Sequence, residues 1–173
     1  MSRLLRMLAL LAACSWTAVN AVLVGVAMTA FGVLKAQLDD LAGRKVAGQV
    51  FGQILDWWTN IAWILAIAAA VGLALTAAMY WYRAARVRPV LLIVLLAAML
   101  GCHAVASLQV SEVAEARAAL EDRDPRDDPA FSKLHKASER VFALETILAL
   151  VATLALATSL VPRDRLEVAV DAD

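Results

Sequence analysis

Residues 57–82 read WWTNIAWILAIAAAVGLALTAAMYWY and contain no charged side chain. A helix needs about 20 predominantly apolar residues to cross the hydrocarbon core of a bilayer, and this stretch exceeds that length. Tryptophans lie near its start, and a Tyr-Trp-Tyr sequence closes it. Aromatic belts of this kind mark the two headgroup levels of a membrane. The stretch therefore predicts a membrane-spanning helix.

Three further stretches have the same character and cover residues 7–34, 89–110 and 141–161. Each is long enough to span a bilayer and is rich in alanine and leucine, which favour helix. A membrane β-barrel would instead alternate polar and apolar residues over about ten positions, and no stretch does so. We therefore predict an all-α fold, an integral membrane four-helix bundle that forms a single domain over residues 1–173.

The composition excludes several other classes of protein. Apolar residues make up 62% of the 173-residue chain and charged residues 18%, and the mean hydropathy is +0.73. Ordinary soluble domains are about 45–50% apolar, so a disordered chain and an ordinary cytosolic enzyme are excluded. Lys and Arg number 16, as do Asp and Glu, which leaves no basic excess to neutralise nucleic-acid phosphates. The expected partners are the lipid bilayer and either another membrane protein or further copies of this chain, with no nucleic acid.

The connection between the first two spans is too polar to cross a membrane but has a helical pattern. Over residues 35–56, leucines and valines recur at steps of three and four, as on one face of a helix. We expect an amphipathic connection that lies on or just above the membrane interface and is broken at Gly43.

Helices three and four are expected to continue beyond the bilayer. Residues 111–121 are rich in strong helix formers, which predicts that helix three runs to about Leu120. Asp128 and Pro129 are typical of an N-cap and a first helical position, so helix four is predicted to begin at Pro129. The two helices then form an extramembrane hairpin whose turn covers residues 122–128.

Lys and Arg in short loops predict the orientation in the membrane. The connection over residues 83–88 holds three arginines and no acid, and with four spans it shares a side with both termini. The longer connections on the other side dilute their basic residues with a larger number of acids. We expect a protein of the bacterial inner membrane with both termini in the cytoplasm.

The start of the chain also has features of a signal peptide. Two arginines precede a short apolar region, residues 11–14 (LAAC) fit a lipoprotein box with Cys14 as the lipidated residue, and residues 19–21 (VNA) resemble a cleavage site. A signal peptide is normally followed by polar sequence, whereas this apolar run continues to Leu34. We expect an uncleaved first span, with lipidation of Cys14 and simple cleavage as the alternatives.

Ionisable side chains at membrane depth are rare and are candidates for function. This chain has two, His103 in the third span and Glu145 in the fourth. Glu145 shares a helix face with His135 and Ser138, and the face continues into small residues. We expect this face to pack against other helices, with Glu145 snorkelling or paired with a base; a protonatable or ligand-binding carboxylate is the alternative. Asn20 in the first span is a candidate for a hydrogen bond between helices.

His103 has Met99 one turn before it and Ser107 one turn after it. We expect a buried histidine bonded to a hydroxyl or a backbone carbonyl. The alternative is a haem- or copper-binding membrane redox protein that uses His103, His135 and Met99. No CxxC, CxxCH, HExxH or GxSxG motif is present, so we expect no cofactor, no metal ligand and no catalytic residue.

Two motifs resemble those of a known family. Residues 131–138 (FSKLHKAS) resemble an F-x-x-L-H-x-x-S signature before the last helix, and residues 41–51 (LAGRKVAGQVF) resemble a stretch after the first helix with two glycines and a phenylalanine. The family is the bacterial domain of unknown function 4149, which is related to eukaryotic transmembrane protein 205. Many members carry an asparagine four residues after the serine, where this chain has Phe142. The resemblance implies the four-span fold and no particular reaction. The positions it marks are His135, Ser138, Gly43, Gly48 and Phe51.

We therefore expect a non-enzymatic, multi-pass membrane protein. It would serve either as a packing partner in a membrane complex or as a small carrier. A carrier would need several copies, because one four-helix bundle leaves little room for a solvated pathway. We also expect His135 and Ser138 to form a structural clamp at the mouth of the bundle, close to Gly43 and Gly48.

Overall fold

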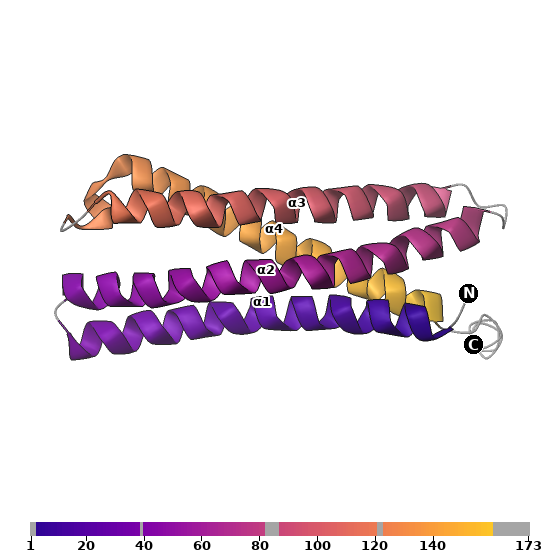
Figure 1. The fold of residues 1–173 in the computed structure, drawn as a ribbon, viewed down its shortest axis with the longest axis horizontal. Helices are drawn as coiled ribbons and strands as arrows, with labels where there is room; N and C mark the ends of the chain where they lie inside the picture. The colour runs from indigo at the N-terminus through magenta and orange to yellow at the C-terminus, as the bar shows by residue number, and fades with distance from the viewer. Residues whose placement is uncertain (1–2, 39, 82–86, 121–122, 161–173) are drawn as a thin grey trace, which may run out of the picture.

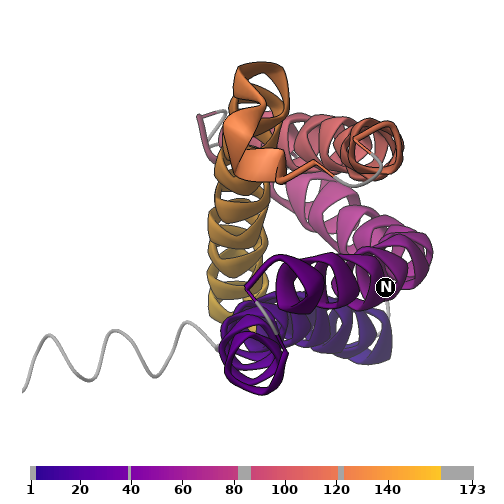
Figure 2. The ribbon, with the colours of Figure 1, turned by 90° about the vertical axis from the view of Figure 1, so that its left-hand side faces the viewer.

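The computed structural model describes residues 3–38, 40–81, 87–120 and 123–160, which fold into an all-helical bundle as predicted. Its elements are α1 (Arg3–Gln37), α2 (Asp40–Trp81), α3 (Val87–Ala118), a short 3-10 helix η1 (Pro125–Asp127) and α4 (Pro129–Leu160). Each long helix packs against the next along the chain, and α4 also packs against α1. Figure 1 shows α4 crossing the bundle diagonally from α3 back to α1, and Figure 2 shows the same closure from one end.

The two ends of the bundle carry different connections. At the terminal end α1 and α3 begin and α2 and α4 end, whereas the hairpin end carries the α1–α2 link and the turn between α3 and α4 (Figure 1). At the terminal end, Arg6 donates a hydrogen bond of 2.9 Å to the backbone oxygen of Ser159 and so joins the first helix to the last. Arg88 lies 4.3 Å from the centre of the Tyr80 ring. The rest of the arginine-rich connection, residues 83–86, lies outside the described residues.

The break predicted at Gly43, within the amphipathic connection between the first two spans, is wrong. Helix α1 runs to Gln37, α2 begins at Asp40, and α2 stays helical through Gly43, so most of residues 35–56 belongs to α2. A glycine inside a helix costs about 0.5–1 kcal/mol relative to alanine. Gly43 and Gly48 are both buried, and at Gly48 the close approach of Arg117 offsets that cost.

Helices α3 and α4 do continue past their apolar segments as predicted. Helix α3 is regular to Ala118 and α4 begins at Pro129. The backbone N–H of Phe131 donates to the carboxylate of Asp128 at 2.9 Å. Asp128 is therefore the N-cap of α4, and its side chain satisfies one of the free amides of the first turn.

Within the described residues, four helices are long and apolar enough to cross a membrane. Their outward faces are apolar as well, and large side chains that are more than half exposed include Leu11, Val22, Ile64, Leu108 and Leu154. A bundle that dissolves in water would place polar residues on those faces. The fold therefore has the character of a multi-pass membrane protein.

Small side chains fill much of the space between the helices. Gly72 of α2 packs directly against Ala9 of α1, because a Cβ atom at Gly72 would overlap the Ala9 side chain. Ala9 and Ala13 are buried in the core. Both precede Cys14, so cleavage immediately before Cys14, as in a lipoprotein, would remove part of this core. Small residues let helices approach closely, which is a common way of packing helices in membranes.

Candidate functional site

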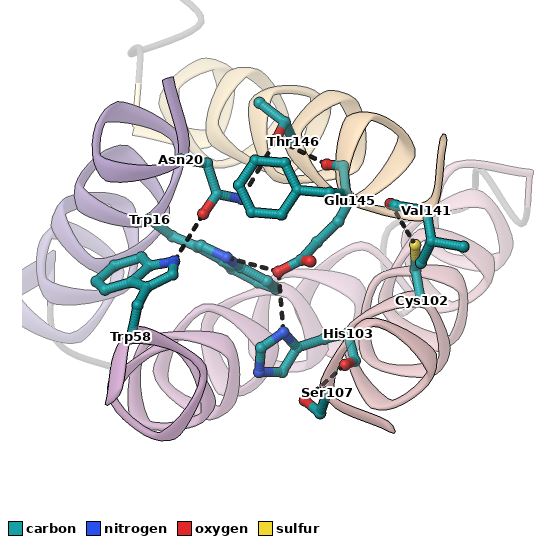
Figure 3. Close-up of polar contacts among 10 residues, drawn as sticks. Trp16, Asn20, Trp58, Cys102, His103, Ser107, Val141, Glu145 and Thr146 are labelled. Carbon is teal, nitrogen blue, oxygen red and sulfur yellow. Dashed lines mark hydrogen bonds and ion pairs between the residues drawn. The ribbon is translucent and has the colours of Figure 1, made fainter. Parts of the chain in front are cut away.

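A histidine and a glutamate meet in the interior of the bundle. Nδ1 of His103 on α3 lies 2.9 Å from Oε1 of Glu145 on α4 (Figure 3). Only 2% of His103 and 3% of Glu145 is exposed. Glu145 thus packs inside the bundle against a base, one of the two outcomes expected for it. The prediction that His103 bonds to a hydroxyl or a backbone carbonyl is wrong, because Nδ1 of its ring contacts the carboxylate of Glu145.

Tryptophan side chains from α1 and α2 enclose the pair. Trp16 Nε1 donates to the same Oε1 of Glu145 at 3.0 Å (Figure 3). The rings of Trp16 and Trp63 stand edge-on to His103, with centroids 5.2 and 4.6 Å away. An ionised carboxylate can only accept hydrogen bonds, so with Glu145 ionised Nδ1 of His103 carries a proton. The carboxylate charge is then stabilised by two donors, and all four long helices contribute to the site.

Helical spacing brings these polar groups to the core. On α1, α3 and α4, most of the buried residues recur at steps of three, four or seven, the spacing of one helix face. They include Ala9, Ala13, Trp16, Asn20 and Leu23 on α1, Leu92, Met99, His103 and Ala106 on α3, and Glu145, Ala149, Ala152 and Leu156 on α4. His103 and Glu145 therefore occupy positions where apolar residues are the rule, and where an ionised group is costly unless it is paired.

A second hydrogen-bonded group lies beside the pair and confirms the prediction for Asn20. Its side-chain oxygen accepts from Trp58 Nε1 at 2.8 Å, and its amide nitrogen donates to Thr146 Oγ1 at 3.3 Å (Figure 3). Asn20 is fully buried, so both ends of its amide need partners. Together these bonds tie α1 to α2 and to α4 next to the His103–Glu145 pair.

His103 lines a small cavity beside the pair. Nε2 is buried and has no hydrogen-bond partner among the described residues. The cavity has a volume of about 20 Å³, enough for about one water molecule. Besides His103 and Glu145, its walls include Thr59 of α2 and Val110 of α3, which lie nearer the hairpin end. The cavity beside the pair therefore lies on the hairpin side.

On the other side of the pair the core is apolar and tightly packed. Leu73, Met99, Ala149, Ala152 and Leu156 lie between the pair and the terminal end, and each has no exposed surface. The described conformation thus separates the pair from the terminal end more completely than from the hairpin end.

The clamp predicted for His135 and Ser138 stays a prediction, and the contacts shown for His135 are with residues of its own helix. The His135 side chain is 47% exposed, its Nε2 lies 3.4 Å from Glu139, and its ring stacks on Phe131 with centroids 5.8 Å apart. Ser138 is half-buried. His135 turns towards its own helix because Phe131 and Glu139, one turn before and one turn after it, supply both a ring and a carboxylate.

The glycines marked by the second motif have a different neighbour. A Cβ atom at Gly48 would overlap the guanidinium group of Arg117 on α3, so this glycine makes room for that side chain. Gly43 is buried one turn earlier on α2, and Phe51 packs against the edge of the apolar core.

The two histidines lie too far apart to ligate one metal ion or one haem. His135 is ten residues before Glu145 on α4, which corresponds to about 15 Å along the helix axis from the residue that binds His103. Within the described ranges, no three His, Cys, Asp or Glu side chains gather closely enough to hold a metal ion. The geometry therefore gives the redox alternative no support.

The fold and the site together define a bundle of four apolar helices closed around a buried histidine–glutamate pair. Comparisons with models of known protein families, with curated proteins and with solved structures found no match for this chain. The functional interpretation therefore depends on the geometry of the described residues.

Sequence reasoning singled out His103 and Glu145 separately but missed that they pair. The sequence predicts Trp58 and Trp63 only as part of an aromatic belt and indicates no role for Trp16, whereas all three side chains contact polar groups of the core. The sequence does contain a signal for this pairing. Asp124 lies inside the predicted turn, and His103 and Glu145 are equally far from it along the chain, so an antiparallel hairpin brings them level with each other.

Proposed function

We propose that this chain is a non-enzymatic, multi-pass integral membrane protein that works as a small proton carrier. The observation that supports this most directly is the His103–Glu145 pair, two groups that can each gain and lose a proton, inside a bundle of four apolar helices. Ionisable residues inside membrane bundles typically mark proton or ion pathways. Well-packed apolar residues can replace a buried ion pair at little or no cost in stability, so packing alone does not account for the pair.

The arrangement of the pair provides a route for a proton. A proton arriving from the hairpin side, where the cavity lined by His103 lies, binds the unpartnered Nε2 of His103 and makes the imidazole a cation. Transfer of the Nδ1 proton to Oε1 of Glu145 then leaves a neutral imidazole and a neutral carboxylic acid. Release towards the terminal end requires the apolar packing there to open, and association of several copies would support such a rearrangement.

Proton flux into lipid vesicles tests this function. We expect vesicles that contain the purified full-length protein and a trapped pH-sensitive dye to acidify faster than empty vesicles under a potassium diffusion potential. Glu145→Gln should abolish the excess flux, because the amide still accepts hydrogen bonds from Trp16 but cannot take up a proton. Glu139→Gln is the matched control, since this glutamate lies on the exposed face of the same helix.

Two outcomes would count against the carrier. Flux equal to that of empty vesicles would favour the other role considered for this chain, a packing partner in a membrane complex. Equal flux through the parent and a Glu145→Gln variant that elutes as a single species with unchanged helicity would show that the proton bypasses the pair.

The proposed orientation places both termini in the bacterial cytoplasm and the hairpin end outside. Its support is the density of arginine in the connection over residues 83–88. In a Cys14→Ala, Cys102→Ala background, we expect Asp127→Cys to react with an impermeant maleimide in intact cells, and Val87→Cys to react only after permeabilisation. Both positions are exposed. Labelling of Val87→Cys alone in intact cells would invert the orientation and the proposed direction of proton entry.

We also propose that the chain is related to the domain of unknown function 4149 family. Its two characteristic motifs, residues 41–51 and 131–138, are far apart in the sequence but come together at the hairpin end. Arg117 links them, because its guanidinium lies against Gly48 and 5.6 Å from the centre of the Phe131 ring. This meeting of the two motifs supports the relationship.

A further inference from the structure

A second polar site lies at the hairpin end, well separated from the His103–Glu145 pair. It is a pocket of about 280 Å³ to which all four long helices contribute. Its main lining residues are Phe31 of α1, Arg44 of α2, Arg117 of α3, and Phe131, Ser132 and His135 of α4. Asp124 and Pro125, from the turn before α4, complete its rim. The volume is at the lower end of the range of small-molecule sites, so it suits a small ligand.

The helices hold Arg117 in place within this pocket. Its guanidinium packs against the backbone of α2 at Gly48, where any side chain would overlap it, and it lies over the Phe131 ring. Contact with an aromatic face and a flat backbone surface limits the rotamers of a long, flexible side chain. A guanidinium held in this way is pre-organised to bind an oxyanion with two parallel hydrogen bonds.

The lining combines positive charge with aromatic surface. Arg44 and Arg117 bring two positive charges and Asp124 one negative charge, so the lining carries a net positive charge with His135 neutral. Phe31 and Phe131 supply flat apolar walls, and Ser132 supplies a hydroxyl. This combination matches a ligand that has an anionic group at one end and an apolar or aromatic body at the other.

We propose that this pocket binds a small organic anion, in which a carboxylate or phosphate group contacts Arg44 and Arg117 and an apolar part packs against Phe31 and the edge of the Phe131 ring. The two family-like motifs are then parts of one binding site, since residues 131–138 supply one wall and Gly48 positions Arg117. The proposal does not depend on proton carriage, because the pocket and the buried pair share no lining residue.

Two sources could supply such an anion. A soluble metabolite with an anionic group would enter the pocket from water, and an anionic lipid would place its headgroup there from the adjacent leaflet. The shared chemistry is an oxyanion joined to an apolar group, and the choice of probe distinguishes the two sources.

Calorimetric titration of the purified full-length protein in a non-ionic detergent tests the pocket. The probes are phenyl phosphate, dioctanoyl phosphatidate in mixed micelles, inorganic phosphate, and benzyl alcohol as a neutral control. We expect one of the first two to bind at a single site, more tightly than inorganic phosphate, and benzyl alcohol not to bind. Binding of phenyl phosphate would indicate a soluble ligand, and binding of phosphatidate alone would indicate a lipid headgroup.

Variants locate the binding in the pocket. Arg44→Gln and Arg117→Gln should each weaken binding by about tenfold to 100-fold, the usual effect of losing a charge-assisted hydrogen bond. Gly48→Ala should weaken it as well, because the added methyl group displaces Arg117. Arg123→Gln and Lys133→Gln are matched controls, since both residues are exposed near the same end and line no part of the pocket. The proposal fails if neither anion binds, or if binding survives both pocket substitutions in protein of unchanged helicity.

Discussion

Replacement of Glu145 by leucine is expected to lower the free energy of unfolding by about 2–6 kcal/mol, because two buried donors lose their acceptor at about 1–3 kcal/mol each. Leucine removes the acceptor that serves both Trp16 Nε1 and His103 Nδ1, and it leaves their polar groups in an apolar core. Reversible unfolding in mixed micelles, followed by circular dichroism, measures the change. Glu139→Leu, at a side chain that is 64% exposed, should change stability by no more than about 0.5 kcal/mol.

The double variant His103→Leu, Glu145→Leu should be more stable than either single variant. Removing both partners leaves no stranded charge, and apolar replacements of a buried pair are often neutral or stabilising. A double variant whose loss of stability equals the sum of the two single losses would mean that the two residues do not interact energetically. A stable double variant that carries no protons would separate the structural contribution of the pair from its proposed function.

The long helices could be predicted because their signals are local. Four apolar runs of sufficient length define them, and Asp128 with Pro129 marks the start of α4 at the residue where the structure begins it. The continuity of the helix through residues 40–56 could not be predicted, because it depends on more than local composition. The polar residues of this stretch indicate correctly that it is less apolar than a span, but they do not show whether the helix ends there.

The register between helices is the information that local patterns lack. His103 and Glu145 are equally distant from Asp124, and so are Arg117 and Phe131, so a tight turn at Asp124 brings both pairs face to face. The predicted turn at residues 122–128 is centred close to Asp124, so it is sufficient to predict which residues of the two helices face each other. The contacts of Trp16 with Glu145 and of Asn20 with Thr146 depend instead on the diagonal path of α4 across α1, which no turn specifies.

The pocket at the hairpin end was partly visible in the sequence. The resemblance marked Gly48 and His135 as positions of interest, and both contribute to the hairpin-end site. Arg117 went unnoticed because it lies in a charged, helix-forming segment where a solvated side chain is the usual outcome. Only the approach of α3 to α2 shows that a glycine is needed opposite it.

Gly72→Ala is expected to destabilise the bundle by about 1–3 kcal/mol, although alanine is the better helix former. The new methyl group would overlap the Ala9 side chain, and Leu156 would lie 3.4 Å from it on the far side. Ala9 is short and fixed to its helix, so it cannot swing away, and α1 and α2 must separate instead. Denaturation midpoints in mixed micelles, compared with those of the parent, measure the effect.

Gly52→Ala and Gly101→Ala provide the matched controls, because a Cβ atom at either position meets no other atom within 4 Å. Both should stabilise the protein by about 0.5–1 kcal/mol through helix propensity alone. Ala9→Gly combined with Gly72→Ala should recover part of the loss, because it removes the overlapping methyl group and leaves the Ala9 Cα position at 3.6 Å. If all three single glycine substitutions stabilise equally, α1 and α2 do not pack at the close distance on which the core of this bundle depends.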